Sequence, residues 1–358
     1  MLKRILALFL LSSTVTAFAQ HPVKVFPGDS KLRYTGRLDP KKDSVEMYWS
    51  GSSVKLNFQG TEVRAVIKDQ RADNFYNVII DRDSIYRLKL DSVKKEYVLA
   101  KDLPEGKHSI ELYKITEYDR GKTVFYGFEL NQGAKVLPPP AMKKRKIEVY
   151  GNSITAGYGV EDTTGDSPAS IYQNNYLSYA ALTARHYDAD YSFIAKSGIG
   201  ITISWFPYTM PEVYDRLNPD DPKSKWDFSR FKPDIVVINL FQNDSWLTNN
   251  PAHAEFKRLF GTKRPTPEFL INAYADFVKT IRSKHPKANI ICVLGNMDIT
   301  REGSPWPGYV EAAVKRLNDK KIYTRFFLYK NTPGHPKIKE QEAMAADLIK
   351  FIDENIKW

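Results

Sequence analysis

Ser153 and His335 are the two residues whose surroundings best suit nucleophilic catalysis. Ser153 lies in Gly-Asn-Ser-Ile-Thr (residues 151–155), directly after the apolar run at residues 147–150. His335 lies in Thr-Pro-Gly-His-Pro (residues 332–336), directly before an expected helix. A neutral imidazole can take the proton of a serine hydroxyl and so make its oxygen a nucleophile toward an acyl carbon. The pair predicts acyl transfer, with Ser153 as nucleophile and His335 as general base.

The sequence of this glycine-rich segment disfavours two other kinds of site. It is not Gly-x-Ser-x-Gly, so the nucleophile elbow of the α/β-hydrolases does not apply. It also lacks the Lys-Ser/Thr pair of a phosphate-binding loop.

A serine nucleophile needs donors for the negative charge that develops on the carbonyl oxygen. Gly198 follows the expected strand at residues 191–195 and can present a bare backbone N–H. Asn243 follows the strand at residues 234–240 and offers a side-chain amide. We expect the oxyanion hole to consist of Ser153, Gly198 and Asn243.

The base has to be chosen among six histidines. His21 is close to the predicted mature N-terminus and His108 lies in the N-terminal half. His186 and His285 precede strands, whereas sites in parallel sheets form at the carboxyl ends of strands. This rule favours His335 as the base. It does not exclude His253, which follows the expected strand at residues 234–240.

The elements that position these residues follow from periodicity. From Lys146 onward, apolar runs alternate with helical patterns, which predicts a parallel five-stranded sheet covered on both faces. Expected strands cover residues 147–150, 191–195, 234–240, 289–294 and 322–328, and expected helices cover 175–187, 267–284, 307–320 and 338–356.

The N-terminal half follows a different pattern. Short runs of alternating apolar and polar residues predict half-buried strands with turns between them, and no helical pattern intervenes. These strands cover residues 53–58, 62–67, 76–80, 86–90, 108–114 and 123–130. We therefore expect an all-β sandwich or jelly roll at residues 20–137, a stiff linker at 138–145 that begins with three prolines, and an α/β domain at 146–358.

Four short blocks of the sequence resemble those of a known family. The blocks at residues 151–155, 198, 242–244 and 334–336 look like those of the SGNH hydrolases. The whole chain past residue 20 resembles carbohydrate esterase family 2, with family-like stretches at residues 49–52, 105–108, 114–117, 150–159 and 197–200. The resemblance implies a jelly roll followed by a three-layer, flavodoxin-like SGNH domain, no cofactor, and removal of acetyl groups from plant polysaccharides such as mannan or xylan.

Three positions depart from the SGNH pattern. Asn152 replaces an aspartate beside the nucleophile, and Phe241 places a large ring where glycine is usual, near the expected pocket. Thr332 stands where the aspartate that orients the imidazole is usual. Either a backbone carbonyl then holds His335, or another acid such as Asp298 substitutes. We expect a Ser–His dyad, which the family resemblance allows.

Trp205, Trp246 and Trp306 each follow a different strand and could stack on sugar rings. Two alternatives to an acetyl esterase stay open: a glycan-binding protein with weak or no catalysis, and a lipid or thioester hydrolase of the same fold.

The N-terminal segment and the composition indicate where the protein is located and what it can bind. Basic Lys3 and Arg4, an apolar run and Ala-Phe-Ala (residues 17–19) predict a secretory signal peptide at residues 1–19, and hence a periplasmic or secreted protein. No later segment is apolar enough to span a membrane. The net charge is +11, but the basic residues are scattered, which disfavours nucleic-acid binding. We find no spacing typical of metal ligands and expect a monomer that binds acetylated polysaccharide or oligosaccharide.

Overall fold

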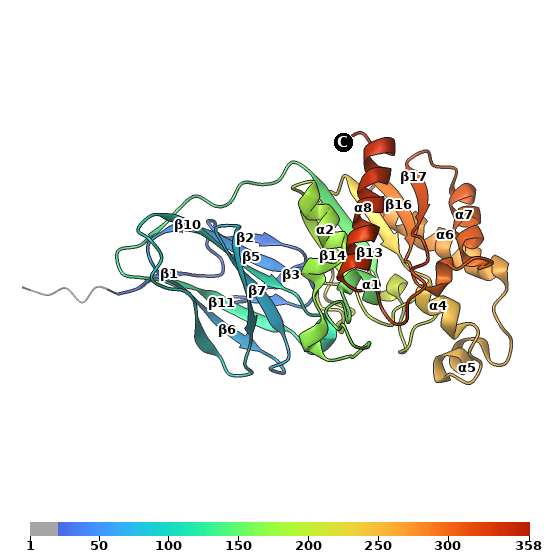
Figure 1. The fold of residues 1–358 in the computed structure, drawn as a ribbon, viewed down its shortest axis with the longest axis horizontal. Coiled ribbons are helices and arrows are strands. Elements are labelled where there is room, and N and C mark those ends of the chain that lie inside the picture. The colour runs from blue at the N-terminus through green and yellow to red at the C-terminus, as the bar shows by residue number, and fades with distance from the viewer. Residues whose placement is uncertain (1–20) are drawn as a thin grey trace, which may run out of the picture.

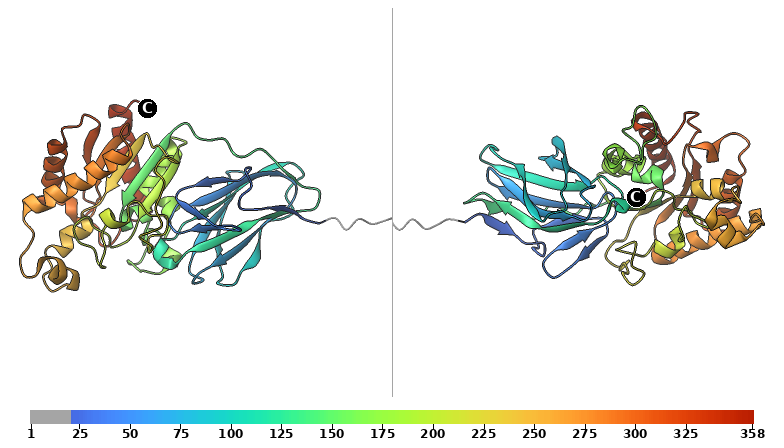
Figure 2. Two further views of the ribbon diagram at one scale, coloured as in Figure 1. Left: turned by 180° about the vertical axis from the view of Figure 1, so that it is seen from behind. Right: turned by 90° about the horizontal axis from the view of Figure 1, so that it is seen from below.

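The computed structural model describes residues 21–358, which form a β domain and an α/β domain lying end to end (Figures 1 and 2). The predicted signal peptide lies outside the described residues. Within residues 21–358, none of the helices has the length and apolar content that crossing a bilayer requires.

The β domain consists of two antiparallel sheets. One contains β1 (Val23–Val25), β3 (Leu38–Pro40), β4 (Val45–Met47), β6 (Val63–Asp69), β9 (Lys95–Ala100) and β11 (Thr123–Leu130). The other contains β2 (Arg33–Thr35), β5 (Ser53–Gln59), β7 (Phe75–Ile80), β8 (Ser84–Lys89), β10 (Lys107–Lys114) and β12 (Lys135–Val136). Alternate residues such as Val54, Leu56 and Phe58 are fully buried in the core of this domain. The alternation read from the sequence therefore marks the inward faces of these strands.

The α/β domain has a five-stranded parallel sheet in the order β14-β13-β15-β16-β17. Its strands are β13 (Lys146–Gly151), β14 (Asp190–Ala195), β15 (Ile235–Asn239), β16 (Asn289–Leu294) and β17 (Ile322–Phe326). The helices α2 (Tyr179–His186) and α8 (Ile338–Asn355) pack together on one face, and α6 (Pro267–Lys284) and α7 (Trp306–Leu317) pack together on the other (Figure 1). The short elements are α1 (Ser153–Ala156), α3 (Met210–Val213), α4 (Gln242–Leu247), α5 (Ala254–Phe260), η1 (Tyr118–Arg120), η2 (Ser170–Tyr172), η3 (Asn175–Leu177) and η4 (Asp298–Thr300).

The predicted fold class is confirmed, with differences at individual elements. The five parallel strands and six of the β-domain strands lie where the sequence predicts them. The sequence pattern does not predict β9, because its exposed position Val98 is apolar and hides the alternation between the buried Tyr97 and Leu99. It also misses the shortest strands, which span only two or three residues. The helix expected at residues 175–187 begins only at Tyr179, because the Ser178 hydroxyl accepts the Ala181 N–H (3.3 Å) and starts the helix there.

The two domains share buried contacts. Arg37 of the β domain is fully buried and donates to Glu148 (3.2 Å) and to the Tyr150 hydroxyl (3.0 Å) of β13. His285 Nε2 lies 2.9 Å from the same Glu148 carboxylate. The segment of residues 137–145, which contains no helix or strand, runs along the outside of the β domain to β13 (Figures 1 and 2). The α/β domain is therefore held by side chains of the β domain as well as by the connecting chain.

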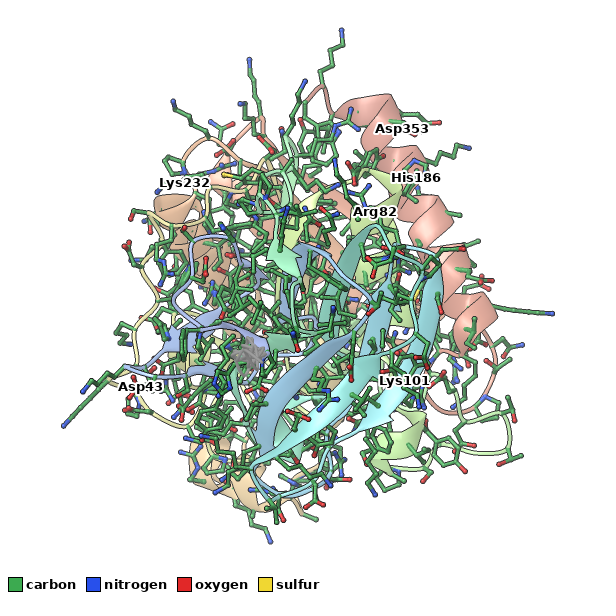
Figure 3. All side chains as sticks on the ribbon, turned by 90° about the vertical axis from the view of Figure 1, so that its left-hand side faces the viewer. Asp43, Arg82, Lys101, His186, Lys232 and Asp353 are labelled. Atoms are coloured by element: carbon green, nitrogen blue, oxygen red, sulfur yellow. The ribbon has the colours of Figure 1, made fainter. Side chains whose placement is uncertain are left out.

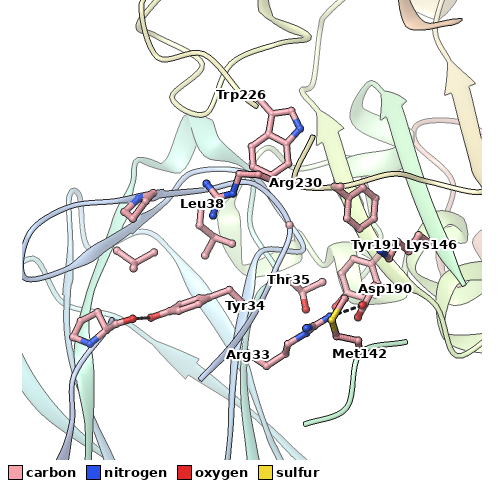
Figure 4. Close-up of a pocket in the computed structure, with 15 residues that line it drawn as sticks. Arg33, Tyr34, Thr35, Leu38, Met142, Lys146, Asp190, Tyr191, Trp226 and Arg230 are labelled. Carbon is pink, nitrogen blue, oxygen red and sulfur yellow. Dashed lines mark hydrogen bonds and ion pairs between the residues drawn. The ribbon is translucent and has the colours of Figure 1, made fainter. Parts of the chain in front are cut away.

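A cavity of about 360 Å³ lies at this interface (Figure 4). The Arg33–Asp190 ion pair (2.7 Å) lies in its wall, together with Lys146 and Tyr191. Lys146 and Asp190 are the first residues of β13 and β14, so this cavity is at the amino-terminal edge of the parallel sheet. The predicted catalytic residues follow the carboxyl ends of the strands and are not among its lining residues.

Candidate active site

Ser153 is the first residue of α1, immediately after the strand β13. Asn152 caps the helix by accepting the Ile154 N–H at its side-chain oxygen (3.1 Å). A Cβ at Gly151 would lie 2.1 Å from Thr155 Oγ1, so only glycine permits this close strand-to-helix turn. Ser153 is only 5% exposed, and its hydroxyl is therefore held at the sheet edge in a confined position.

His335 is placed between Ser153 and a carboxylate. Its Nε2 lies 2.8 Å from Ser153 Oγ, and its Nδ1 lies 2.7 Å from Asp166 Oδ2. A proton on Nδ1 can be donated to the Asp166 carboxylate. In this tautomer Nε2 carries a lone pair, which can accept the proton of the Ser153 hydroxyl. The Tyr158 ring packs against the imidazole, with centroids 4.4 Å apart. These contacts form the hydrogen-bonded chain Ser153–His335–Asp166.

Asp166 comes from the loop between α1 and η2. The Asp162 carboxylate shapes that loop by accepting the backbone N–H groups of Thr164, Gly165 and Ser167. The Lys337 ammonium donates to the carbonyl oxygens of Gly159 (2.9 Å) and Gly165 (2.8 Å) and lies 3.5 Å from Asp166 Oδ1. The loop is thus tied to the start of α8, two residues after His335.

The surroundings of Asp166 favour its ionised form. Partial burial alone would raise its pKa, but the hydrogen bonds and charge of His335, together with the charge of Lys337, lower the pKa of Asp166 to about 2. Gly334 permits the close approach, because its φ is +68° and a Cβ there would lie 2.9 Å from Asp166 Cγ.

The expected Ser–His dyad is therefore wrong for this chain, and so is Asp298 as the alternative acid. Asp298 accepts hydrogen bonds from Trp246 Nε1 (2.8 Å) and Gln242 Nε2 (2.9 Å) and does not contact His335. The Thr332 hydroxyl contacts Lys330 and Glu340. Sequence reasoning missed Asp166, although a signal existed: Asp-Thr-Thr-Gly-Asp-Ser (residues 162–167) places two carboxylates in a turn just after the nucleophile.

The strand register brings the expected oxyanion-hole residues to one edge. Gly151 pairs with Ala195 of β14 and with Asn239 of β15. Ser153, Gly198 and Asn243 follow these paired positions by two, three and four residues. All three therefore lie beyond the same end of the sheet, as the carboxyl-end rule requires.

The donors at this edge differ in their availability. Within residues 21–358, no hydrogen bond occupies the backbone N–H of Ser153 or Gly198. Asn243 lies on α4, where its Nδ2 already donates to the Ile199 carbonyl (2.8 Å) and its Oδ1 accepts the Trp205 indole N–H (3.1 Å). One hydrogen of the Asn243 amide remains for a substrate oxygen.

Phe241, the second departure from the family pattern, does not line a pocket as we expected. Its ring is fully buried in the core against Tyr274 and Trp306. Its φ of +80° lies in the left-handed region, which glycine adopts without strain and a residue with a large side chain rarely adopts.

The three candidate sugar-stacking tryptophans have different surroundings. Trp205 is 48% exposed, and its backbone N–H donates to the Gly198 carbonyl (3.0 Å), so it lies at the site. Trp246 lines a cavity of about 470 Å³ that also includes Asp298, Arg301 and Gly334, next to His335. Trp306 is 6% exposed and packs against Phe241 and Tyr309. The prediction that Trp306 binds substrate is therefore wrong, because its ring belongs to the core.

The other histidines have contacts of their own. His253 caps α5 and packs edge-on against Trp205. His285 is buried against Glu148, and His108 contacts Asp81 in the β domain. His186 is exposed at the end of α2 (Figure 3). Only His335 contacts Ser153 among the histidines of residues 21–358.

Both halves of the chain match family models. Residues 34–140 match the model described as carbohydrate esterase 2 N-terminal, and residues 149–321 match the GDSL-like lipase/acylhydrolase family.

Individual relatives are similar over almost the whole chain. The cellulase/esterase CelE of Acetivibrio thermocellus is 33% identical over 95% of this chain, which spans 41% of that relative's length. An acetylxylan esterase/glucomannan deacetylase of Cellvibrio japonicus is 25% identical, covering 98% of this chain and 93% of the relative. The solved structure of a family two carbohydrate esterase from Clostridium thermocellum in complex with cellohexaose is 32% identical, with a TM-score of 0.80, covering 90% of this chain and 98% of that one.

Proposed function

This chain belongs to carbohydrate esterase family 2, and from that premise we propose that it is an exported serine esterase that removes O-acetyl groups from hemicellulose. The observation that carries the proposal is the chain of contacts from Ser153 Oγ to His335 (2.8 Å) and from His335 to Asp166 (2.7 Å). A serine hydroxyl, an imidazole and a carboxylate in this order form the arrangement that acyl transfer requires.

In the proposed reaction, Ser153 Oγ attacks the acetyl carbonyl carbon while His335 Nε2 accepts the hydroxyl proton. Asp166 keeps the imidazole oriented and stabilises its charged form. The backbone N–H groups of Ser153 and Gly198 and the free hydrogen of the Asn243 amide donate to the tetrahedral oxyanion. His335 then gives the proton to the departing sugar oxygen, which leaves acetyl-Ser153.

Water completes the cycle. His335 Nε2 takes a proton from a water molecule, whose oxygen attacks the acetyl carbonyl carbon. As the second tetrahedral intermediate collapses, the bond to Ser153 Oγ breaks and His335 returns the proton to that oxygen, which releases acetic acid and restores the free serine.

Acetylated xylan or glucomannan is the proposed substrate. The names of the relatives from Cellvibrio japonicus and the cellohexaose complex of the clostridial esterase support a polysaccharide ligand. Trp205 beside Gly198 and Trp246 beside the His335 loop are the rings placed to contact sugars. We propose that the protein acts as a monomer outside the cytoplasm.

Acetate release from acetylated xylan and acetylated glucomannan tests the proposal, with Ser153→Ala as the matched inactive variant. Release by the native enzyme, and none by Ser153→Ala, is expected. Glycan binding without acetate release would instead identify a binding protein. A series of aryl esters separates the lipid-hydrolase alternative: a deacetylase prefers acetate over butyrate, whereas activity that rises with acyl length would contradict the proposal.

A further inference from the structure

We propose that Glu117 of the β domain is a positioning residue for the oxyanion loop, defined as residues 197–200, and thereby makes the β domain part of the catalytic machinery. This inference rests on the proposed esterase function. It assigns to the first domain a role in the chemistry in addition to any role in holding polysaccharide.

Glu117 reaches from the β domain into the α/β domain. It follows β10 and directly precedes η1, and its side chain is fully buried. Its Oε2 accepts the backbone N–H of Ser197 (2.7 Å), and its Oε1 accepts the Ser197 hydroxyl. Ser197 immediately precedes Gly198, whose N–H is the proposed oxyanion donor.

The segment that carries Glu117 is itself fixed. The buried Lys114 ammonium donates to the carbonyl oxygens of Thr116 (2.8 Å) and Glu117 (3.0 Å). Gln173 of the α/β domain accepts the Glu117 backbone N–H (3.2 Å). These hydrogen bonds fix the backbone around Glu117. The Glu117 carboxylate can therefore restrict the position of Ser197 and of the oxyanion loop.

A second carboxylate holds the other end of the loop. Asp244 on α4 accepts the backbone N–H groups of Ile201 (3.0 Å) and Thr202 (2.6 Å). Gly198 lies between the two anchors with φ at +80°, and a Cβ there would meet Trp205 and Phe206 at 3.2 Å. A donor fixed before the reaction stabilises the oxyanion without reorganising, so loss of one anchor should lower kcat more than it changes KM.

Burial of a carboxylate is costly, and this cost argues against a purely packing role. Burial, with the nearby Asp119, raises the pKa of Glu117 to about 7, while the two Ser197 hydrogen bonds and Lys196 lower it. A neutral side chain of the same size would fill this space without the charge. The carboxylate form, which can accept both Ser197 donors, is the one that holds the loop.

Several charged or titratable groups face Glu117. They are Lys114 from β10, Asp119 from η1, Tyr158 after α1, and Lys196 after β14. Burial lowers the pKa of Lys114 to about 7, so this lysine loses its proton as the pH rises and acts on the alkaline side. Glu117 gains its proton as the pH falls and acts on the acid side. The proposed base His335, which must be unprotonated to act, also contributes to the acid limb but is kept in every variant. An ionisation that disappears from the acid limb on Glu117→Gln therefore identifies Glu117.

The test compares Glu117→Gln and Ser197→Ala with the native enzyme, using an aryl acetate from pH 5 to pH 9. Glu117→Gln should lower kcat by roughly 10-fold or more with little change in KM, since removal of one oxyanion-hole donor itself costs about 100-fold or more. Its acid limb should lose one ionisation. Glu111→Gln, the same substitution on the neighbouring strand β10, is the control and should behave as the native enzyme.

Ser197→Ala guards against a folding defect in the first variant. It removes one hydrogen bond to the Glu117 carboxylate, which should raise the pKa of that carboxyl group and move the acid limb to higher pH. If both variants keep the native kcat and acid limb while Ser153→Ala is inactive, this inference is overturned and the esterase function stands. Absence of turnover in the native enzyme would contradict the esterase function and this inference together.

Discussion

Asp166 contacts His335 at two points, although the two residues are 169 positions apart in the sequence. Its Oδ2 lies 2.7 Å from His335 Nδ1, and its Oδ1 accepts the His335 backbone N–H at 3.1 Å. One carboxylate therefore fixes both the ring and the backbone of the proposed base. The loop that carries Asp166 therefore supplies the carboxylate that is absent at Thr332.

Asp166→Asn should greatly reduce activity while leaving the fold intact. An amide can keep the contact but no longer favours the imidazole with a proton on Nδ1, so kcat/KM should fall by roughly 10²- to 10⁴-fold. Steady-state kinetics on an aryl acetate checks this. Asp81→Asn is the control: Asp81 makes the corresponding contact with His108 Nδ1 (2.7 Å) in the β domain, so kcat/KM should stay near the native value. Equal losses in the two variants would contradict the assignment of Asp166.

Gly334→Ala should reproduce part of the Asp166 defect. The new Cβ would lie 2.9 Å from Asp166 Cγ, which forces the carboxylate away from the imidazole. Gly303→Ala is a matched control, because Gly303 also has a positive φ (+81°) but no atom lies within 4 Å of its added Cβ. Both variants share the backbone strain, and only Gly334→Ala should lose kcat/KM. A similar kcat/KM for the two would show that strain alone accounts for any loss.

The stabilising effect of Asp166 should depend on pH in the acid range. Its pKa is lowered in the folded protein to about 2, so the stabilisation is fully present above the ordinary carboxyl pKa and disappears as the pH falls through about 2. Asp166→Asn should therefore lower Tm at pH 7, and the difference from the native protein should shrink below pH 4. Thermal unfolding at several pH values measures this. A difference that grows on acidification would contradict the direction of the shift.

The buried contact between the domains should dominate the stability of their interface. Burial would raise the pKa of Glu148, but the charges of Arg37 and His285 lower it, so the carboxylate is ionised beside Arg37. Arg37→Met leaves this charge without its main partner and should destabilise the protein by roughly 3–5 kcal/mol.

Arg64→Met is the control for this substitution, because the ion pair of Arg64 with Glu96 is exposed and should contribute little to the free energy of unfolding. Urea unfolding followed by tryptophan fluorescence compares the two variants. Equal, small losses of unfolding free energy in the two variants would indicate that the buried pair does not hold the domains together.

Sequence reasoning located Ser153 and His335 because each follows a strand of a regular parallel sheet, where position alone predicts the edge. The same rule could not find Asp166, since it lies in a loop between α1 and η2 that no strand precedes. Trp306 satisfied the rule and yet is buried, because it begins α7 and its ring turns toward Phe241. Periodicity predicts which edge a residue occupies, whereas side-chain direction depends on packing between elements distant in sequence.

Glu117 shows the same limit from the other domain. Its neighbourhood reads as the end of a β strand, and nothing in the local pattern indicates that its carboxylate contacts Ser197, 80 residues later. Only the assembled interface reveals that contact.

Identification of the acylated residue tests the central claim most directly. The native enzyme, mixed rapidly with an aryl acetate and quenched, should show a burst of phenol close to one equivalent and a single acetyl group on the peptide that contains Ser153. Ser153→Ala should show neither, and Asp166→Asn should form the same adduct more slowly. An acetyl group on another residue, or native turnover in Ser153→Ala, would contradict the account.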